Sequence, residues 1–216
     1  MKKYFILILL LFSISFAGLL SPENGATLSA THIKFEWEQV PDATEYIIEI
    51  NGSYIATSQS LIYISTSDLT WNTNYSWTIK PVFSDGSIGG SIGNYNFSIS
   101  ESRSNASATG SHEEGVTIFS SFFDYYSAAI DENGNEIWNS GNENLIFYNT
   151  DYYGQLFGAK LDNGAENYLP VVEYNLDNEI IWQEPANHFA HHEMIQLPNG
   201  NYMSIVEDIQ LGPIPP

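Results

Sequence analysis

The sequence contains no cysteine, and only six of its 216 residues are lysine or arginine. Disulfide bonds are therefore excluded, and the hydrophobic core alone must stabilise the fold. The basic residues after position 17 are Lys34, Lys80, Arg103 and Lys160, and they stand against 26 acidic residues. Because binding to nucleic acid or anionic lipid needs clustered Lys or Arg, we expect neither as a partner.

Long apolar runs are also absent, except at the N-terminus. Two lysines precede an apolar stretch at residues 4–14, and small residues occupy positions −3 and −1 of a cleavage site after Ala17. This layout predicts a secretory signal peptide at residues 1–17. The run is shorter than the ~20 residues that span a bilayer, so we predict cleavage and no remaining membrane span. The mature chain is expected in the periplasm, in the medium or at the cell surface.

Residues 21–100 alternate apolar and polar side chains in several short segments. The apolar positions are Ile33, Phe35 and Trp37, then Tyr46, Ile48 and Ile50, then Tyr75, Trp77 and Ile79. Turn residues at 41–43 and at Asn51-Gly52 separate these segments. Period-2 alternation between such turns predicts half-buried antiparallel strands, and therefore a small β-sandwich.

This segment resembles the fibronectin type III family. The matching residues are Trp37, Pro41, Ala43 and Tyr46, together with Tyr75-Ser76-Trp77. The resemblance implies a seven-stranded sandwich that acts as a spacer or docking module, and it implies no chemistry. Residues 101–114 follow, with no large apolar side chain, and they are predicted to be a linker.

A repeat begins at residue 115. The segments "YYSAAIDENGNEIW" and "YLPVVEYNLDNEIIW" end at Trp138 and Trp182, 44 residues apart. The segments "KLDNGAENYL" and "QLPNGNYMSI" each place Asn-Gly, a hairpin dipeptide, between β-rich stretches. A period of ~40–50 residues with several short strands is typical of β-propeller blades. A plain antiparallel sandwich with accidental similarity is the alternative.

We therefore expect an all-β chain in which residues 115–216 form part of a β-propeller. Closing a propeller takes at least about four blades, so the chain is expected to be the N-terminal part of a longer protein. The segment "DENGNE" at 131–136 resembles a calcium loop, but it lacks the spacing of an EF-hand. It is predicted to be a hairpin turn.

The segment "HFAHHE" contains His188, His191 and His192, and it allows three interpretations. A zinc site would place His188 and His192 on one helix face, but Pro185 and the β-rich surroundings argue against a helix. The histidines could instead hydrogen-bond backbone groups at the start of a strand. In the third interpretation they do acid–base or nucleophilic chemistry. Because strand neighbours face opposite ways, only His191 or His192 would then face a propeller channel.

The second half also resembles the bacterial arylsulfotransferase family that uses no nucleotide sulfate donor. One matching segment supplies Ile130, Asp131, Gly134 and, one residue early, Trp138; the other supplies His191, His192, Glu193 and Leu197 to Asn201. The paired histidine ahead of the Leu-Pro-Asn-Gly-Asn turn is the more specific match. A fibronectin-like β-domain ahead of a propeller also fits the family.

The resemblance implies a six-bladed propeller with its active site in the central channel. A histidine attacks the sulfuryl group of a phenolic sulfate ester, and a phenol then takes that group from the histidine. His192 and His191 are the candidate catalytic residues here, as acid or stabiliser of the sulfuryl oxygens rather than as nucleophile. No cofactor and no metal are expected.

The sequence also lacks residues that the arylsulfotransferase family uses in catalysis. The nucleophilic histidine and the sulfate-binding arginine lie in later blades of the family, and residues 115–216 contain no arginine. Lys160 is the only fixed cation there, so the chain alone is expected to be inactive. The alternative function is that of a non-catalytic secreted protein, in which a propeller and a fibronectin-type domain serve binding or adhesion.

Overall fold

The computed structural model describes residues 17–104, 106, 115–122, 124–161, 169–185, 190–206 and 212, and at 190–192 only the backbone. The described residues form seventeen strands in five sheets and no helix, so the chain is all-β as predicted. No helix in this part of the chain is therefore long and apolar enough to cross a membrane. The proposed signal peptide, apart from Ala17, lies outside the described residues.

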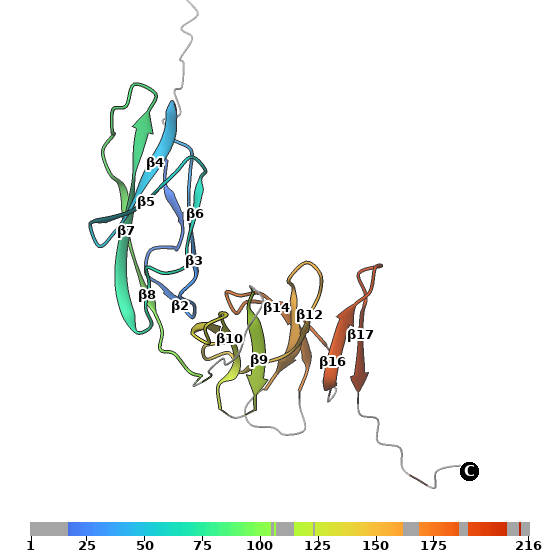
Figure 1. The fold of residues 1–216 in the computed structure, drawn as a ribbon. Coiled ribbons are helices and arrows are strands. Elements are labelled where there is room, and N and C mark those ends of the chain that lie inside the picture. Colours follow the sequence, from blue (N-terminus) through green and yellow to red (C-terminus); the bar gives the residue numbers. More distant parts are fainter. Residues whose placement is uncertain are drawn as a thin grey trace, which may run out of the picture.

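The first half is a β-sandwich of two sheets, drawn in blue to green in Figure 1. The smaller sheet has the order β1 (Leu19–Ser21), β3 (Ile33–Trp37) and β6 (Ile62–Ser65). The larger has the order β2 (Ala26–Leu28), β8 (Ile92–Ile99), β7 (Thr73–Phe83), β4 (Ala43–Ile50) and β5 (Ser53–Ser58). All pairs are antiparallel except the parallel pair of β2 and β8. This arrangement is consistent with the predicted fibronectin III-like sandwich.

The core of the sandwich contains the residues that the alternation placed on its inner faces. Phe35 lies edge-on to Trp77, with ring centroids 5.0 Å apart, and Trp37 lies edge-on to Tyr46 at 5.4 Å. Ile48 is completely buried. Burying one such aliphatic or aromatic side chain contributes roughly 1.5–3 kcal/mol, which replaces the stabilisation that disulfides would give.

The second half consists of three antiparallel sheets that lie side by side, from yellow-green to red in Figure 1. The first has the order β11 (Glu136–Asn139), β10 (Tyr126–Ile130) and β9 (Thr117–Ser121). The second is a meander of β12 (Leu145–Thr150), β13 (Leu156–Lys160), β14 (Val171–Tyr174) and β15 (Ile180–Gln183). The third pairs β16 (Ala190–Gln196) with β17 (Tyr202–Val206). Within the described residues these sheets do not close into a ring.

The repeat seen in the sequence recurs in the strands. Trp138 lies on β11 and Trp182 on β15, each on the strand after a hairpin turn. The same shift relates β10 to β14 and β12 to β16. Four successive strands, β10 to β13, are thus followed by four that correspond to them, β14 to β17.

Four hairpins of the second half share one five-residue turn, in which the first residue donates its N–H to the carbonyl of the fifth. The fourth residue has a positive φ, which favours Gly or Asn. The turns are Asp131–Asn135, Asp151–Gln155, Asn175–Glu179 and Leu197–Asn201, and their fourth residues are Gly134, Gly154, Asn178 and Gly200. The predicted turns at 131–136 and at Asn199-Gly200 are confirmed, although at the second only Gly200 has a positive φ. The predicted turn in "KLDNGAENYL" falls largely outside the described residues.

Candidate functional site

The backbone of His191 and His192 lies in β16, in a strand and not in a helix. Their side chains, and all of His188, lie outside the described residues. The β16–β17 register is irregular between Ala190 and Met194, which is where the two histidines stand. Because His188 lies outside the described residues, its position relative to His192, on which the zinc interpretation depended, is not described.

Beyond the histidines, β16 is anchored to the neighbouring four-stranded sheet. Met194 is fully buried and packs against Phe157 of β13 and Val171 of β14. The Asn149 side chain on β12 donates its Nδ2–H to the Met194 carbonyl at 2.9 Å. Glu193, which follows the two histidines in the arylsulfotransferase-like motif, is exposed. The position of β16 against β12 and β13 is therefore fixed by packing and by a hydrogen bond.

The earliest strands of the three sheets are neighbours. Ser120 on β9 receives the Phe147 N–H of β12 at 2.7 Å and donates its hydroxyl to the Phe147 carbonyl at 2.9 Å. β12 in turn contacts β16. The order β9, β12, β16 therefore runs across the three sheets, and His191 and His192 belong to the last of these strands.

A buried carboxylate beside β16 was missed by sequence reasoning. Glu173 on β14 is only 3% exposed, and it accepts a hydrogen bond from the Tyr202 hydroxyl of β17. Gln196 of β16 donates to the same hydroxyl at 3.2 Å, and the Trp182 ring stacks on Tyr202 with centroids 4.0 Å apart. Burial, and then the hydrogen bond to Glu173, raise the pKa of Tyr202. The available signal was one acidic residue within the apolar run "LPVVEY".

Fixed positive charge is scarce near these strands. Lys160, the only Lys or Arg after residue 114, forms an ion pair with Glu143 at 3.0 Å. The residues matched around Ile130 and Asp131 lie in the β10–β11 hairpin of the first sheet, apart from β16. The Asp131 carboxylate accepts the N–H groups of Asn133 and Asn135, which closes the turn.

The sandwich docks on the first sheet through backbone pairing. Ala30, between β2 and β3, forms an antiparallel bridge with Trp138 of β11. Thr31 N–H donates to the Ile137 carbonyl and Asn139 N–H to the Ser29 carbonyl, each at 2.9 Å. Residues 29–31 thus pair with β11 as an additional edge segment. We refer to this contact as the junction.

Glu136 strengthens the junction. Its carboxylate accepts hydrogen bonds from the N–H groups of Arg103 and Ser104, at 3.0 and 2.5 Å, and from the Asn139 side chain at 2.7 Å. Its backbone carbonyl accepts the Trp71 indole N–H at 2.9 Å. One residue of β11 therefore holds both the sandwich and the first residues of the predicted linker.

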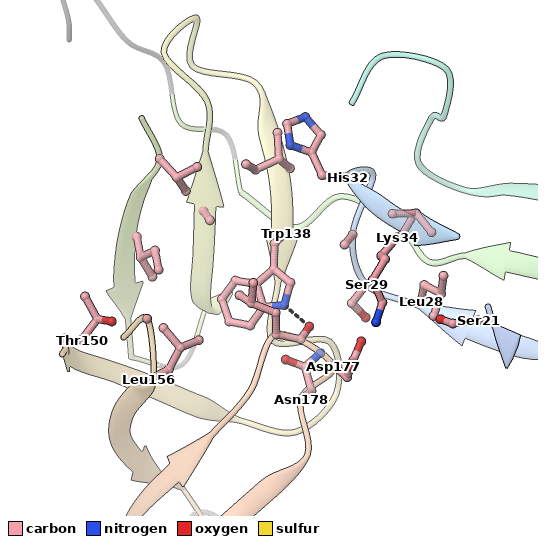
Figure 2. A pocket seen from close by; sticks show the side chains of 18 of the residues that line it. Ser21, Leu28, Ser29, His32, Lys34, Trp138, Thr150, Leu156, Asp177 and Asn178 are labelled. Atoms are coloured by element: carbon pink, nitrogen blue, oxygen red, sulfur yellow. Dashed lines mark hydrogen bonds between the residues drawn. The ribbon is translucent and has the colours of Figure 1, made fainter. Parts of the chain in front are cut away.

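A pocket of about 720 Å³ opens beside the junction, between the sandwich and the sheets (Figure 2). Trp138 lies at its centre and donates its indole N–H to the Leu176 carbonyl at 2.6 Å, the dashed line in Figure 2. The pocket is lined by Leu28 and Ser29 of the sandwich and by Leu156, Asp177 and Asn178 of the four-stranded sheet and its turns. Its volume is in the range of small-molecule sites, which often lie between domains.

No family model and no curated protein matches this sequence. Among solved structures, the chain is similar to the fibronectin(III)-like modules of Clostridium thermocellum CbhA, with 11% sequence identity and a TM-score of 0.34. That similarity covers 40% of this chain and 99% of the other. At this score it carries no functional meaning, and the arylsulfotransferase resemblance receives no support from the comparisons.

Proposed function

We propose that the chain is the N-terminal part of an exported arylsulfotransferase-like protein, which moves a sulfuryl group from a phenolic sulfate ester to a phenol. The proposal rests on the paired histidine ahead of the Leu197–Asn201 turn. The observation that supports it best is that this pair stands on β16, the first strand of its sheet and the counterpart of β12.

The arrangement of the sheets agrees with the first blades of a propeller. β12 to β15 form a four-stranded antiparallel meander, which is the build of one blade. In a propeller the first strand of each blade lines the central channel. By the 44-residue shift β12 and β16 are such first strands and contact one another, whereas β9 corresponds to β13. A histidine on β16 would then be available to a substrate in that channel.

The chemistry proceeds in two displacements. A histidine nitrogen forms a bond to sulfur while the bond from sulfur to the phenolic oxygen breaks, and an acid gives its proton to the leaving phenolate. The acceptor phenol then attacks the same sulfur, loses its proton and releases the histidine. His192 or His191 would, in its protonated imidazolium form, serve as the acid or stabilise the sulfuryl oxygens, because imidazole gains and loses a proton near pH 7.

The nucleophile and an arginine for the sulfuryl oxygens must come from further blades. Lys160 is already paired with Glu143, so residues 115–216 offer no free cation to a sulfate group. The same scarcity supports a second candidate, a secreted protein that binds ligands without catalysis.

The test uses the intact exported product. Its mass is measured first, because a mass well above 24.2 kDa is needed for a propeller that closes. Transfer from 4-nitrophenyl sulfate to phenol is then followed as nitrophenol release. A larger mass with transfer supports the enzyme. A mass matching residues 18–216 rejects the enzyme in favour of a binding protein. A larger folded protein that shows no transfer does the same.

In that product His192→Ala should lower the transfer rate by at least about tenfold, since a positioned acid or base contributes roughly 10²–10⁴. His112→Ala, in the predicted linker, is the matched control and should leave the rate unchanged. Wild-type turnover in a folded His192→Ala protein would remove His192 from the site.

A further inference from the structure

The third sheet of the second half, β16 with β17, leaves one face uncovered. Met203 and Ile205 of β17 are 55% and 59% exposed. The half-buried Ile195 of β16 pairs in register with Met203 and shares its face. Met194 and Tyr202 lie on the opposite face and pack against the second sheet. We call Ile195, Met203 and Ile205 the outer patch, since exposed apolar side chains that gather on one face mark interaction surfaces.

The edge of β17 beside the outer patch is open as well. β17 is an end strand of its sheet, and among the described residues it pairs only with β16 (Figure 1). Its sequence, YMSIV, contains no charged residue and no proline. Charged residues and proline are common protections against pairing with a further strand, so this edge is suited to accept one.

The second sheet shows what covers the equivalent face. Phe157 and Met203 each stand two residues after the five-residue turn of their hairpin, and Ala159 and Ile205 each stand four residues after it. Phe157 is only 1% exposed and packs against Met194 of the third sheet, and Ala159 is completely buried. The counterparts of the exposed pair on β17 are therefore buried, and the sheet that follows in the chain covers Phe157.

The first and second sheets are stacked in a related way. Trp138 of the first sheet stacks on Tyr174 of the second, with ring centroids 6.5 Å apart. Trp182 of the second sheet stacks on Tyr202 of the third, with centroids 4.0 Å apart. In both cases a Trp on an end strand meets a Tyr of the following sheet. The contact between successive sheets thus occurs twice, and the outer patch is the surface on which it would continue.

We infer that the outer patch is the docking surface for a further β-sheet of the same chain, stacked on the third sheet as the third is stacked on the second. The inference rests on the proposed function, in which the chain continues into further blades. An apolar side chain of that sheet contacts Met203, as Met194 contacts Phe157. The open edge of β17 pairs with a third strand, as β13 pairs with β14. A second copy of the chain is the rival occupant.

Methionine oxidation of the intact exported product tests the inference. After residue 17 the sequence contains two methionines, of which Met194 is completely buried and Met203 is 55% exposed. The product is treated with hydrogen peroxide, and the sulfoxide at each position is quantified by mass spectrometry. With the outer patch covered, Met203 should oxidise at least about tenfold more slowly than in the same product unfolded in urea. This protection should not depend on protein concentration.

The outcomes separate the inference from the proposed function. Met203 that reacts in the folded product as fast as in urea overturns the inference, even if nitrophenol is released and the enzyme is supported. Protection of Met203 in a larger product without transfer supports the inference and rejects the enzyme. Protection that is lost on dilution identifies a second copy as the occupant and overturns the inference. A mass matching residues 18–216 rejects both.

A charged substitution in the outer patch gives a second test. Ile205→Lys should lower the melting temperature of the intact product by about 5 °C or more, because it places a charge in a covered apolar interface. Ile88→Lys is the matched control, since Ile88 in the sandwich is also 59% exposed. It should change the melting temperature by less than about 1 °C. Equal shifts for the two variants would overturn the inference.

Discussion

At the scale of single residues, the carboxylate of Asp131 shows how the polar residues of the second half are used. It accepts the N–H groups of Asn133 and Asn135 at 2.9 and 2.8 Å, and its second oxygen accepts the Asn135 side-chain N–H. Burial raises the pKa of Asp131, but the hydrogen bonds from Asn135 and Asn133 outweigh it and hold the pKa below 3.8. An acidic chain can therefore use carboxylates to shape turns.

Asp131→Ala should lower the free energy of unfolding by about 1 kcal/mol, the net value of the hydrogen bonds that are lost. The depressed pKa means that this contribution is complete above the unfolded value of about 4 and disappears as the pH falls through the folded pKa. Urea unfolding at pH 7 and at pH 3 measures both effects.

The matched variant is Asp131→Asn, which keeps one acceptor oxygen for the turn and should cost less than Asp131→Ala. It also removes the titration, so its stability should fall less than that of the wild type between pH 7 and pH 3. A cost for Asp131→Ala that does not shrink at pH 3 would contradict the role given to the carboxylate.

At the scale of elements, β11 does more than complete its sheet. One edge pairs with β10, and the other accepts residues 29–31 of the sandwich. The sandwich therefore protects an edge that would otherwise be open to pairing with another chain. Glu136 adds hydrogen bonds from the segment that follows β8, which ties the exit of the sandwich to the same strand.

Glu136→Ala should lower the free energy of unfolding by about 2 kcal/mol, because several N–H donors at the junction lose a charged acceptor. Glu132→Ala is the control: this glutamate lies in the same hairpin, is exposed, and carries the same charge. Denaturant unfolding of both variants makes the comparison. An equal decrease in the free energy of unfolding for both variants would mean that the loss of charge, and not the loss of the junction hydrogen bonds, accounts for the effect.

The strands themselves were largely predictable, because alternation and turn residues are local properties. Phe35, Trp37, Ile48 and Trp77 were assigned to the inner faces from their spacing, and all are buried. The 44-residue repeat likewise identified corresponding strands around Trp138 and Trp182.

The candidate site was less predictable. The backbone strand under His191 and His192 was expected, but the Glu173–Tyr202 contact joins residues 29 positions apart on different sheets. No local pattern encodes such a contact. The pocket beside the junction could not be predicted either, because in the sequence each of its walls has the pattern of an ordinary turn or strand end.

At the scale of the whole molecule, the junction joins the sandwich to the sheets, and the two halves approach each other closely at Gly141. A Cβ on Gly141 would lie 2.8 Å from Ser29 Oγ, and Gly141 has a φ of 56°. The tight contact predicts that the two halves unfold together in one cooperative transition, which differential scanning calorimetry can measure.

Gly141→Ala should lower stability by backbone strain of about 1 kcal/mol, and the clash with Ser29 should add to it. The transition should then separate into two. Gly154→Ala is the control, since Gly154 has a φ of 81° and nothing within 4 Å of the added Cβ. It should lose stability through strain alone and keep one transition. Two transitions in the wild type would contradict a coupled junction.

The sequence alone determined the strands, their inner faces, the tight turns and the repeat, because each follows from the alternation of side chains and the conformational freedom of Gly and Asn. Only the tertiary structure decided that residues 29–31 pair with β11 and that Glu136 binds the chain at 103–104. It also formed the pocket between the sandwich and the sheets. These features arise where the sandwich and the sheets meet, and their fit depends on shape and on hydrogen-bonding groups far apart in the chain.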